Sequence, residues 1–105
     1  MLLVLTADLL WRSRIESALA GAGVQVRWME RAAELEGAAE PEQFWVDLTA
    51  PEAIAAIAEA RSRFPRCRIV AFGPHLDRDQ ARQARQAGAD EVLGRGAFLA
   101  RYLSG

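Results

Sequence analysis

The chain has 105 residues, of which 51% are hydrophobic, and its 13 basic and 14 acidic side chains leave a net charge of −1. This length fits one domain with one core, predicted over residues 1–105, and the balanced charge excludes strong long-range attraction to nucleic acid or an anionic membrane. The single cysteine, Cys67, excludes an internal disulfide framework and favours a reducing cytoplasm, and the apolar run over residues 2–5 is too short to span a membrane or to serve as a signal peptide.

The first half of the chain alternates apolar runs of strand length with segments of helical period. A strand over residues 2–5 precedes a helix that ends near two glycines and whose apolar positions share one face: Trp11, Ile15, Leu19 and Ala22. The next strand, over residues 24–29, alternates apolar and polar side chains, which is typical of an edge strand. A short helix over residues 31–39 follows, weakened by Gly37 and ended by Pro41.

The second half continues the alternation. We expect strands over residues 44–48, 68–72 and 91–93, helices over residues 52–63 and 77–87, and a short closing helix marked by Phe98, Leu99, Tyr102 and Leu103. Five such units predict an α/β protein of the flavodoxin-like (βα)5 type, a three-layer sandwich. Because crossovers between parallel strands are right-handed, the five-stranded parallel sheet is expected in the order 2-1-3-4-5.

Asp47 is the first candidate for chemistry. It closes a buried strand, and Pro51 turns the chain soon afterwards. Ligands of open parallel sheets bind at the carboxyl ends of the strands, so an acid at this place is a candidate functional group. The structural alternative is a carboxylate that pairs with Arg95 or caps the following turn. Asp8 has two interpretations as well, namely a metal ligand or the N-cap of the helix that begins at Leu9.

Two other titratable side chains are weaker candidates. Arg66 and Arg68 flank Cys67 and could lower the pKa of its thiol. His75 follows a proline in a loop at the same edge of the sheet, where it could bind an anion or titrate near neutrality. A solvated histidine and an inert cysteine are the ordinary alternatives.

Three segments together resemble the receiver domain of bacterial response regulators, the CheY-like family. They are residues 47–51 (DLTAP), 68–72 (RIVAF) and 87–95 (AGADEVLGR). The resemblance covers essentially the whole chain. It implies a signalling protein of a two-component, phosphorelay-type system that is not an enzyme, with a kinase, an output protein or a scaffold protein as its partner.

The resemblance also implies four functional positions. A receiver has an acidic pair after its first strand, a phosphoacceptor Asp after the third, Thr or Ser after the fourth and Lys after the fifth. Asp47 falls on the phosphoacceptor position. The acidic pair falls on Thr6 and Ala7, and the two switch positions fall on Gly73 and Arg95. Only the acceptor is unchanged.

The loss of the acidic pair has a chemical consequence. Phosphoryl transfer to a carboxylate needs Mg²⁺ to neutralise charge on the phosphoryl oxygens, and Mg²⁺ needs a near-octahedral set of oxygen ligands. Asp8 and Asp47 are the weak metal candidates that remain, so we expect no cofactor, or Mg²⁺ bound poorly. Gly73 also lacks the hydroxyl that would couple a phosphoryl group to a loop movement.

A stripe of arginines suggests a partner surface. Arg78, Arg82 and Arg85 lie at helical spacing on one outward face of the helix over residues 77–87. Solvation alone can explain such a stripe, but the resemblance places a docking and dimerisation surface here, together with the fifth strand and the closing helix, and arginine is enriched in interfaces. With Arg101 and Tyr102 added, we predict a surface for an acidic protein or a second copy of the chain, and not for nucleic acid or a membrane.

Three functions follow from these patterns. A stand-alone degenerate receiver, or pseudo-receiver, that acts by phosphorylation-independent protein–protein interaction fits an acceptor without its acidic pair. The second is a phosphorylatable single-domain response regulator that accepts phosphate on Asp47. The third, a small flavodoxin-like nucleotide-binding protein or enzyme, is disfavoured because the sequence has no Ser/His/Asp set, no metal cluster and no glycine-rich phosphate loop.

Overall fold

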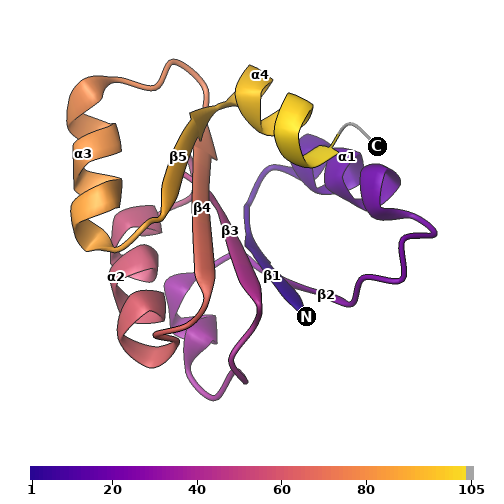
Figure 1. Ribbon diagram of the computed structural model, residues 1–105, viewed down its shortest axis with the longest axis horizontal. Helices are drawn as coiled ribbons and strands as arrows, with labels where there is room; N and C mark the ends of the chain where they lie inside the picture. The colour runs from indigo at the N-terminus through magenta and orange to yellow at the C-terminus, as the bar shows by residue number, and fades with distance from the viewer. Residues whose placement is uncertain (104–105) are drawn as a thin grey trace.

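A five-stranded parallel sheet forms the centre of the protein (Figure 1). The computed structural model describes residues 1–103. The strands lie in the order β2-β1-β3-β4-β5, as predicted. They are β1 (Leu2–Leu5), β2 (Val26–Met29), β3 (Gln43–Asp47), β4 (Arg68–Gly73) and β5 (Glu91–Gly94).

Helices cover both faces of this sheet. Figure 1 shows α2 and α3 on one face and α1 and α4 on the other, so the predicted three-layer flavodoxin-like sandwich is confirmed. The α-helices are α1 (Leu9–Leu19), α2 (Ala53–Arg63), α3 (Arg78–Ala87) and α4 (Arg95–Phe98); η1 (Ala32–Leu35) is a 3₁₀ turn and η2 (Leu99–Leu103) is π-helical. Within residues 1–103, no helix has the length and apolar character needed to cross a bilayer.

The two faces of the sheet bury different kinds of side chain. Successive residues of a strand point to opposite faces, so Leu3 and Leu5 join the core under α2 and α3, whereas Leu2 and Val4 join the core under α1 and α4. The first core is mostly aliphatic and includes many alanines, with Phe44 and Phe64 as its aromatic side chains. The second is aromatic and is built from Trp11, Trp45, Phe72, Phe98 and Tyr102.

Phe98 is the residue that docks α4 on the sheet. Its ring is fully buried and stacks on Phe72 with centroids 4.1 Å apart, and it meets Trp45 edge-on at 5.2 Å. Burying an aromatic ring of this size contributes about 1.5–3 kcal/mol, and ring pairs add to this. The closing helix is therefore held in place by aromatic packing.

The predicted helix over residues 31–39 is wrong in extent, since only the single 3₁₀ turn η1 forms. The Glu34 carboxylate accepts the backbone N–H groups of Glu30 and Arg31 at 2.8 and 2.9 Å, which caps the start of η1. These two hydrogen bonds are also the main cause of a lowered pKa at Glu34. Gly37, at a φ of +79°, then turns the chain away.

The first helix and the second strand are both shorter than predicted. Gly21 and Gly23 have φ values of +79° and +72°, which end α1 at Leu19 and leave Ala22 exposed outside the helix. Val24, placed in the strand by the sequence pattern, precedes β2 and is 44% exposed. The strand itself lies at the edge of the sheet, as its alternation predicted.

The Ala-Gly-Ala-Asp turn before β5 is a structural joint. At Gly88, with a φ of +128°, an added Cβ would lie 2.7 Å from Arg61 Cβ, so only glycine fits. Arg61 donates to the carbonyl oxygens of Gly88 and Cys67 and to the carboxylate of Asp90, which also accepts the N–H of Ile69 at 2.8 Å. The turn thus ties α2 to β4 and β5.

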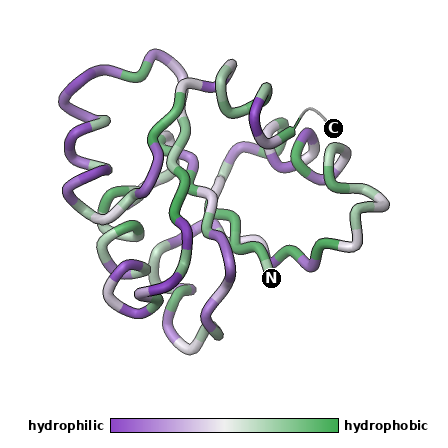
Figure 2. Tube along the Cα trace, viewed as in Figure 1, coloured by the Kyte–Doolittle hydropathy of each residue, from purple (hydrophilic) through white to green (hydrophobic). Residues whose placement is uncertain are grey.

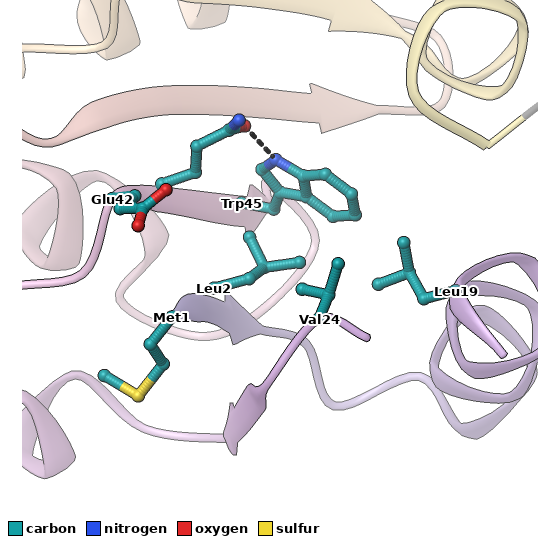
Figure 3. A pocket seen from close by; sticks show the side chains of 7 residues that line it. Met1, Leu2, Leu19, Val24, Glu42 and Trp45 are labelled. Carbon is teal, nitrogen blue, oxygen red and sulfur yellow. Dashed lines mark hydrogen bonds between the residues drawn. The ribbon is translucent and has the colours of Figure 1, made fainter. Parts of the chain in front are cut away.

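A small apolar hollow lies beside the amino-terminal ends of β1 and β3 (Figure 3). It has a volume of about 180 Å³, and Leu2, Leu19, Val24 and Trp45 form most of its wall. The indole N–H of Trp45 donates to the side-chain oxygen of Gln43 at 2.9 Å, which satisfies the buried polar group there.

Candidate functional site

The sequence-predicted site residues come from the carboxyl ends of four neighbouring strands. Thr6 follows β1, Asp47 ends β3, Gly73 ends β4 and Arg95 follows β5. The strands are in register there, with Asp47 beside Phe72 and Gly73 beside Gly94. Because parallel strands end at one edge, the fold gathers these positions at the place where ligands of such sheets bind.

The carboxylate of Asp47 is held by three hydrogen bonds. The Thr6 hydroxyl donates to Oδ2 at 2.8 Å. Both the backbone N–H and the hydroxyl of Thr49 donate to Oδ1, at 2.9 and 2.7 Å. Asp47 therefore caps the turn that follows β3, as the structural alternative predicted, and each of its oxygens has a donor.

Asp47 is also completely buried, with an exposed fraction of 0%, and Thr6 is 4% exposed. The Thr6 hydroxyl further accepts the backbone N–H of Asp8 at 3.1 Å. A neutral hydroxyl thus stands where a receiver has an acid, and it connects the end of β3 to the start of α1. Ala7, at the second acidic position, is exposed and brings no charge.

Gly73 lies against the residue that follows Asp47. An added Cβ at Gly73 would meet Leu48 Cβ at 3.3 Å, a closer approach than most Cβ atoms make. The backbone N–H of Leu48 donates to the carbonyl of Phe72 at 2.8 Å, which fixes this spacing. The position therefore lacks a hydroxyl, and a larger residue would require Leu48 to move.

Arg95 does not pair with Asp47, so that prediction is wrong. Its guanidinium lies over the Trp11 ring, 5.0 Å from the centroid, and Nη2 is 3.6 Å from Asp8 Oδ2. The physical reason is that Thr6 and Thr49 already donate hydrogen bonds to Asp47. The Arg95 guanidinium instead finds the face of the Trp11 ring and the partly exposed carboxylate of Asp8. The guanidinium is thereby drawn toward α1.

Asp8 is the N-cap of α1, as one of its two interpretations predicted. Its Oδ1 accepts the N–H groups of Leu10 and Trp11 at 2.9 and 3.2 Å, while Oδ2 faces Arg95. Asp8 and Asp47 are thus turned to different partners and do not offer a shared set of oxygens. Nowhere in residues 1–103 do three or more His, Cys, Asp or Glu side chains form a group able to hold a metal ion.

The predicted partner surface divides into two parts. Arg78, Arg82 and Arg85 are exposed on the outer face of α3, which is hydrophilic along its length (Figure 2), and they line one open hollow with Leu76 and Ala81. Arg82 is paired with Asp79, whereas Arg78 and Arg85 have no ion pair among the described residues.

The second part lies along β5, the edge strand. Glu91 receives the Tyr102 hydroxyl at 2.5 Å and forms ion pairs with Arg68, at 3.0 Å, and with Arg101. Arg101 and Tyr102 are therefore committed to a network on the strand edge. Within the part of the predicted surface that the structure describes, the guanidinium groups without an ion pair are those of Arg78 and Arg85 on α3.

Cys67 and His75 differ from each other in their surroundings. Cys67 is buried, and burial raises the pKa of its thiol to about 11, against the opposing influence of Arg61. The prediction that flanking arginines lower this pKa is wrong, because desolvation outweighs them. His75 is exposed in the loop after β4, with a φ of +47°.

Two residues of the site were missed from the sequence. Thr49 follows Asp47 by two positions, and an Asp with a hydroxyl residue at that spacing is a signal of a side-chain-capped turn. Trp11 was assigned to the core alone, yet Arg14 and Arg95 both lie over its ring. Nothing in the sequence places Arg95 beside α1, since that contact depends on the route of the chain after β5.

Comparison with known proteins finds no matching family model and no matching curated protein. Solved structures do match. A response regulator from Burkholderia pseudomallei, crystallised with a phosphorylated aspartic acid, a calcium ion and citrate, has a TM-score of 0.81 at 26% identity over 98% of this chain. This chain spans 65% of the length of that protein.

Two further structures are similar over nearly their whole length. The BeF₃-activated receiver domain of DrrB has a TM-score of 0.80 at 16% identity, with 95% of this chain and 91% of that chain covered. The phosphorylated cyanobacterial phytochrome response regulator RcpA has a TM-score of 0.80 at 17% identity, with 97% and 84% covered. At these identities the likeness is one of fold.

The strand order and the site at the carboxyl edge of the sheet define a flavodoxin-like α/β protein. Within that class, the chain resembles the receiver domains of response regulators, the CheY-like domains of two-component signalling, along nearly all of its length. The predicted family resemblance is confirmed.

Proposed function

We propose that this chain is a degenerate receiver domain that acts by protein–protein interaction without phosphorylation of Asp47. One observation carries the proposal: the Asp47 carboxylate has no exposed surface, and both of its oxygens accept hydrogen bonds from Thr6 and Thr49. A carboxylate oxygen must attack phosphorus in line with the leaving group, and here neither oxygen is exposed to a phosphoryl donor.

The hydrogen-bond donors around Asp47 stabilise the free carboxylate and not the transition state of phosphoryl transfer. The Thr6 and Thr49 hydroxyls stabilise the carboxylate that already exists, whereas catalysis requires groups that stabilise charge developing on the phosphoryl oxygens. Arg95, the cation that would approach those oxygens, is instead held by Trp11 and Asp8. The arrangement supports a structural role for Asp47.

The exposed face of α3 is the proposed partner surface. Arg78 and Arg85 have no ion pair among residues 1–103, so their charges are available to an acidic protein surface. Leu76 and Ala81 provide an apolar floor between them. Exposed arginines of this kind increase the rate and the specificity of association with an acidic partner, and both effects weaken as salt screens the charges.

Beryllofluoride binding tests the proposal. The protein is titrated with Mg²⁺ and beryllofluoride while Trp45 emission and the amide spectrum of residues 47–51 are followed, with Asp47→Asn as the control. We expect the wild type and the control to respond alike. A saturable change in the wild type that Asp47→Asn abolishes would contradict the proposal.

The alternative is a phosphorylatable response regulator that uses Asp47. It is favoured by the Burkholderia pseudomallei structure, which contains a phosphorylated aspartic acid. In this chain the reaction would require Thr6 and Thr49 to release the carboxylate and the turn after β3 to open. The same titration separates the two functions.

Self-association is tested separately. Sedimentation over a concentration series, repeated at high salt, distinguishes a second copy from an acidic protein as the occupant of the α3 face. We expect a monomer, because two copies of an arginine-rich face repel each other. A dimer that Arg78→Glu or Arg85→Glu changes would assign the face to self-association.

A further inference from the structure

A third hollow lies between the start of α1 and the junction of β5 with α4. It has a volume of about 310 Å³ and is lined by Asp8, Leu10, Trp11, Arg14 and Arg95. Figure 1 shows α1 and α4 on the same face of the sheet. The hollow is separate from the buried carboxylate, because neither Asp47 nor its partners Thr6 and Thr49 line it.

Two guanidinium groups meet in this hollow. Arg95 and Arg14 both lie over Trp11, with Cζ 5.0 and 5.7 Å from the ring centroid. Trp11 is only 5% exposed, so the ring serves as a fixed wall that positions both cations. Like charges brought to one place are stabilised when an anion lies between them.

The hydrogen-bonding capacity of these arginines is incompletely used. Arg95 Nη2 lies 3.6 Å from Asp8 Oδ2, which is too long for a hydrogen bond. Arg95 Nε is buried without a hydrogen-bond partner. Arg14 has no ion pair with any of the described residues. A buried donor without a partner is uncommon. Arg95 Nε is itself shielded from a ligand, but the Arg95 side chain as a whole is 34% exposed, so its exposed part can donate to an acceptor in the hollow.

The hollow also has an apolar side. Leu10 is 82% exposed, and its neighbour Leu9 is 72% exposed. These two are the most exposed large hydrophobic side chains of residues 1–103. An apolar group next to an anion would cover Leu10 while its charge reached the arginines.

We propose that this hollow binds a small organic carboxylate. The carboxylate accepts hydrogen bonds from Arg14 and Arg95, and the apolar body covers Leu10. Two arginines and one aspartate leave a single net positive charge in the hollow, which matches a monoanion better than a phosphate dianion. The site makes no use of Asp47, so it is independent of whether that residue is phosphorylated.

Benzoate is the probe, followed by ¹⁵N NMR of the whole chain at constant ionic strength and pH 7. The indole N–H of Trp11 and the Nε–H of Arg95 report on the hollow. Benzamide has the same ring without the charge, acetate has the charge without the ring, and inorganic phosphate tests a dianion. We expect saturable shifts with benzoate and weaker binding of the other three.

Matched variants locate the site. Arg14→Gln should weaken benzoate binding roughly tenfold, which is the loss of one charge-assisted hydrogen-bonded partner. Arg85→Gln, an equally exposed helix arginine outside the hollow, should leave binding unchanged. Asp8→Asn should strengthen it, because Asn still caps α1 but removes the competing carboxylate.

Several outcomes would overturn the proposal. Shifts that grow linearly without saturation, or an equal effect of Arg14→Gln and Arg85→Gln, would mean non-specific attraction to surface arginines. Tighter binding of phosphate than of benzoate would mean a dianion site. Arg14→Gln and Asp8→Asn test the hollow from opposite directions, and neither replaces a buried residue.

Discussion

The Asp47 cluster and the Trp11–Arg95 hollow lie at the same end of the sheet, yet they treat charge in opposite ways. Asp47 is fully buried, and each oxygen has a neutral donor. In the hollow, Arg95 is about one third exposed, its ion pair with Asp8 is long, and one nitrogen has no partner. A carboxylate whose oxygens both have hydrogen-bond donors serves the structure, whereas a guanidinium with unused donors can still bind a ligand.

The difference arises from a small number of side chains. Thr6 removes the acid that would leave Asp47 in need of a cation, so Arg95 is free to associate with Trp11. Gly73 allows Leu48 to pack closely beside the acid. The Arg95 guanidinium therefore lies beside α1 and not beside the carboxylate at the end of β3.

Phe98→Ala should have the largest effect on stability, about 3–5 kcal/mol, because it leaves a cavity in the aromatic core that docks α4. It should disrupt the hollow and leave the hydrogen bonds of Asp47 in place. Chemical denaturation measures the first effect, and NMR of Thr49 measures the second. Equal disturbance at both places would show that the two regions are one unit.

Thr6→Val should cost roughly 2–3 kcal/mol, since it leaves an oxygen of a buried carboxylate without its donor. Valine keeps the shape and removes only the hydroxyl. Thr49→Val is the matched control on the other oxygen, and its smaller cost reflects an exposed residue whose backbone N–H still donates. Urea denaturation measures the loss of unfolding free energy in both variants. A larger loss for Thr49→Val than for Thr6→Val would contradict this prediction.

Asp47→Ala should cost less than Thr6→Val, roughly 1–2 kcal/mol, because it leaves no buried charge without a partner. It takes the acceptor from the neutral hydroxyl of Thr6 and from the N–H and hydroxyl of Thr49, an exposed residue that water can reach. The two changes together should cost less than the sum of their separate effects, since they remove one interaction. A double-mutant cycle in urea gives the coupling. Strict additivity would deny that Thr6 holds Asp47.

Cys67 should show the smallest effect, confined to alkaline pH. Burial raises its pKa from about 9 to about 11. The protonated thiol is therefore favoured by the fold, and its contribution is fully present below pH 9 and lost as the pH rises toward 11. We expect the native thiol to react with iodoacetamide far more slowly at pH 8 than the unfolded chain. Equal rates would contradict the burial.

Sequence reasoning predicted the strand order and the burial of the strands because period-two and helical patterns survive packing. It failed at residues 31–39, where Gly37 with its left-handed backbone turns the chain after one 3₁₀ turn, and at Ala22, where left-handed glycines end α1. It identified Asp47 correctly as the end of a strand. The spacing of Asp47 and Thr49 could have identified Thr49 as a donor. The contact of Arg95 with Trp11 could not be foreseen, because it depends on the route of the chain after β5.

Intact-protein mass spectrometry after incubation with acetyl phosphate and Mg²⁺ tests the central claim, that Thr6 and Thr49 make Asp47 a structural carboxylate, most directly. Asp47→Asn is run beside the wild type. The account predicts no phosphorylated species in either protein. A phosphorylated wild type together with an unmodified Asp47→Asn would show that the carboxylate opens to its donor and would contradict the account.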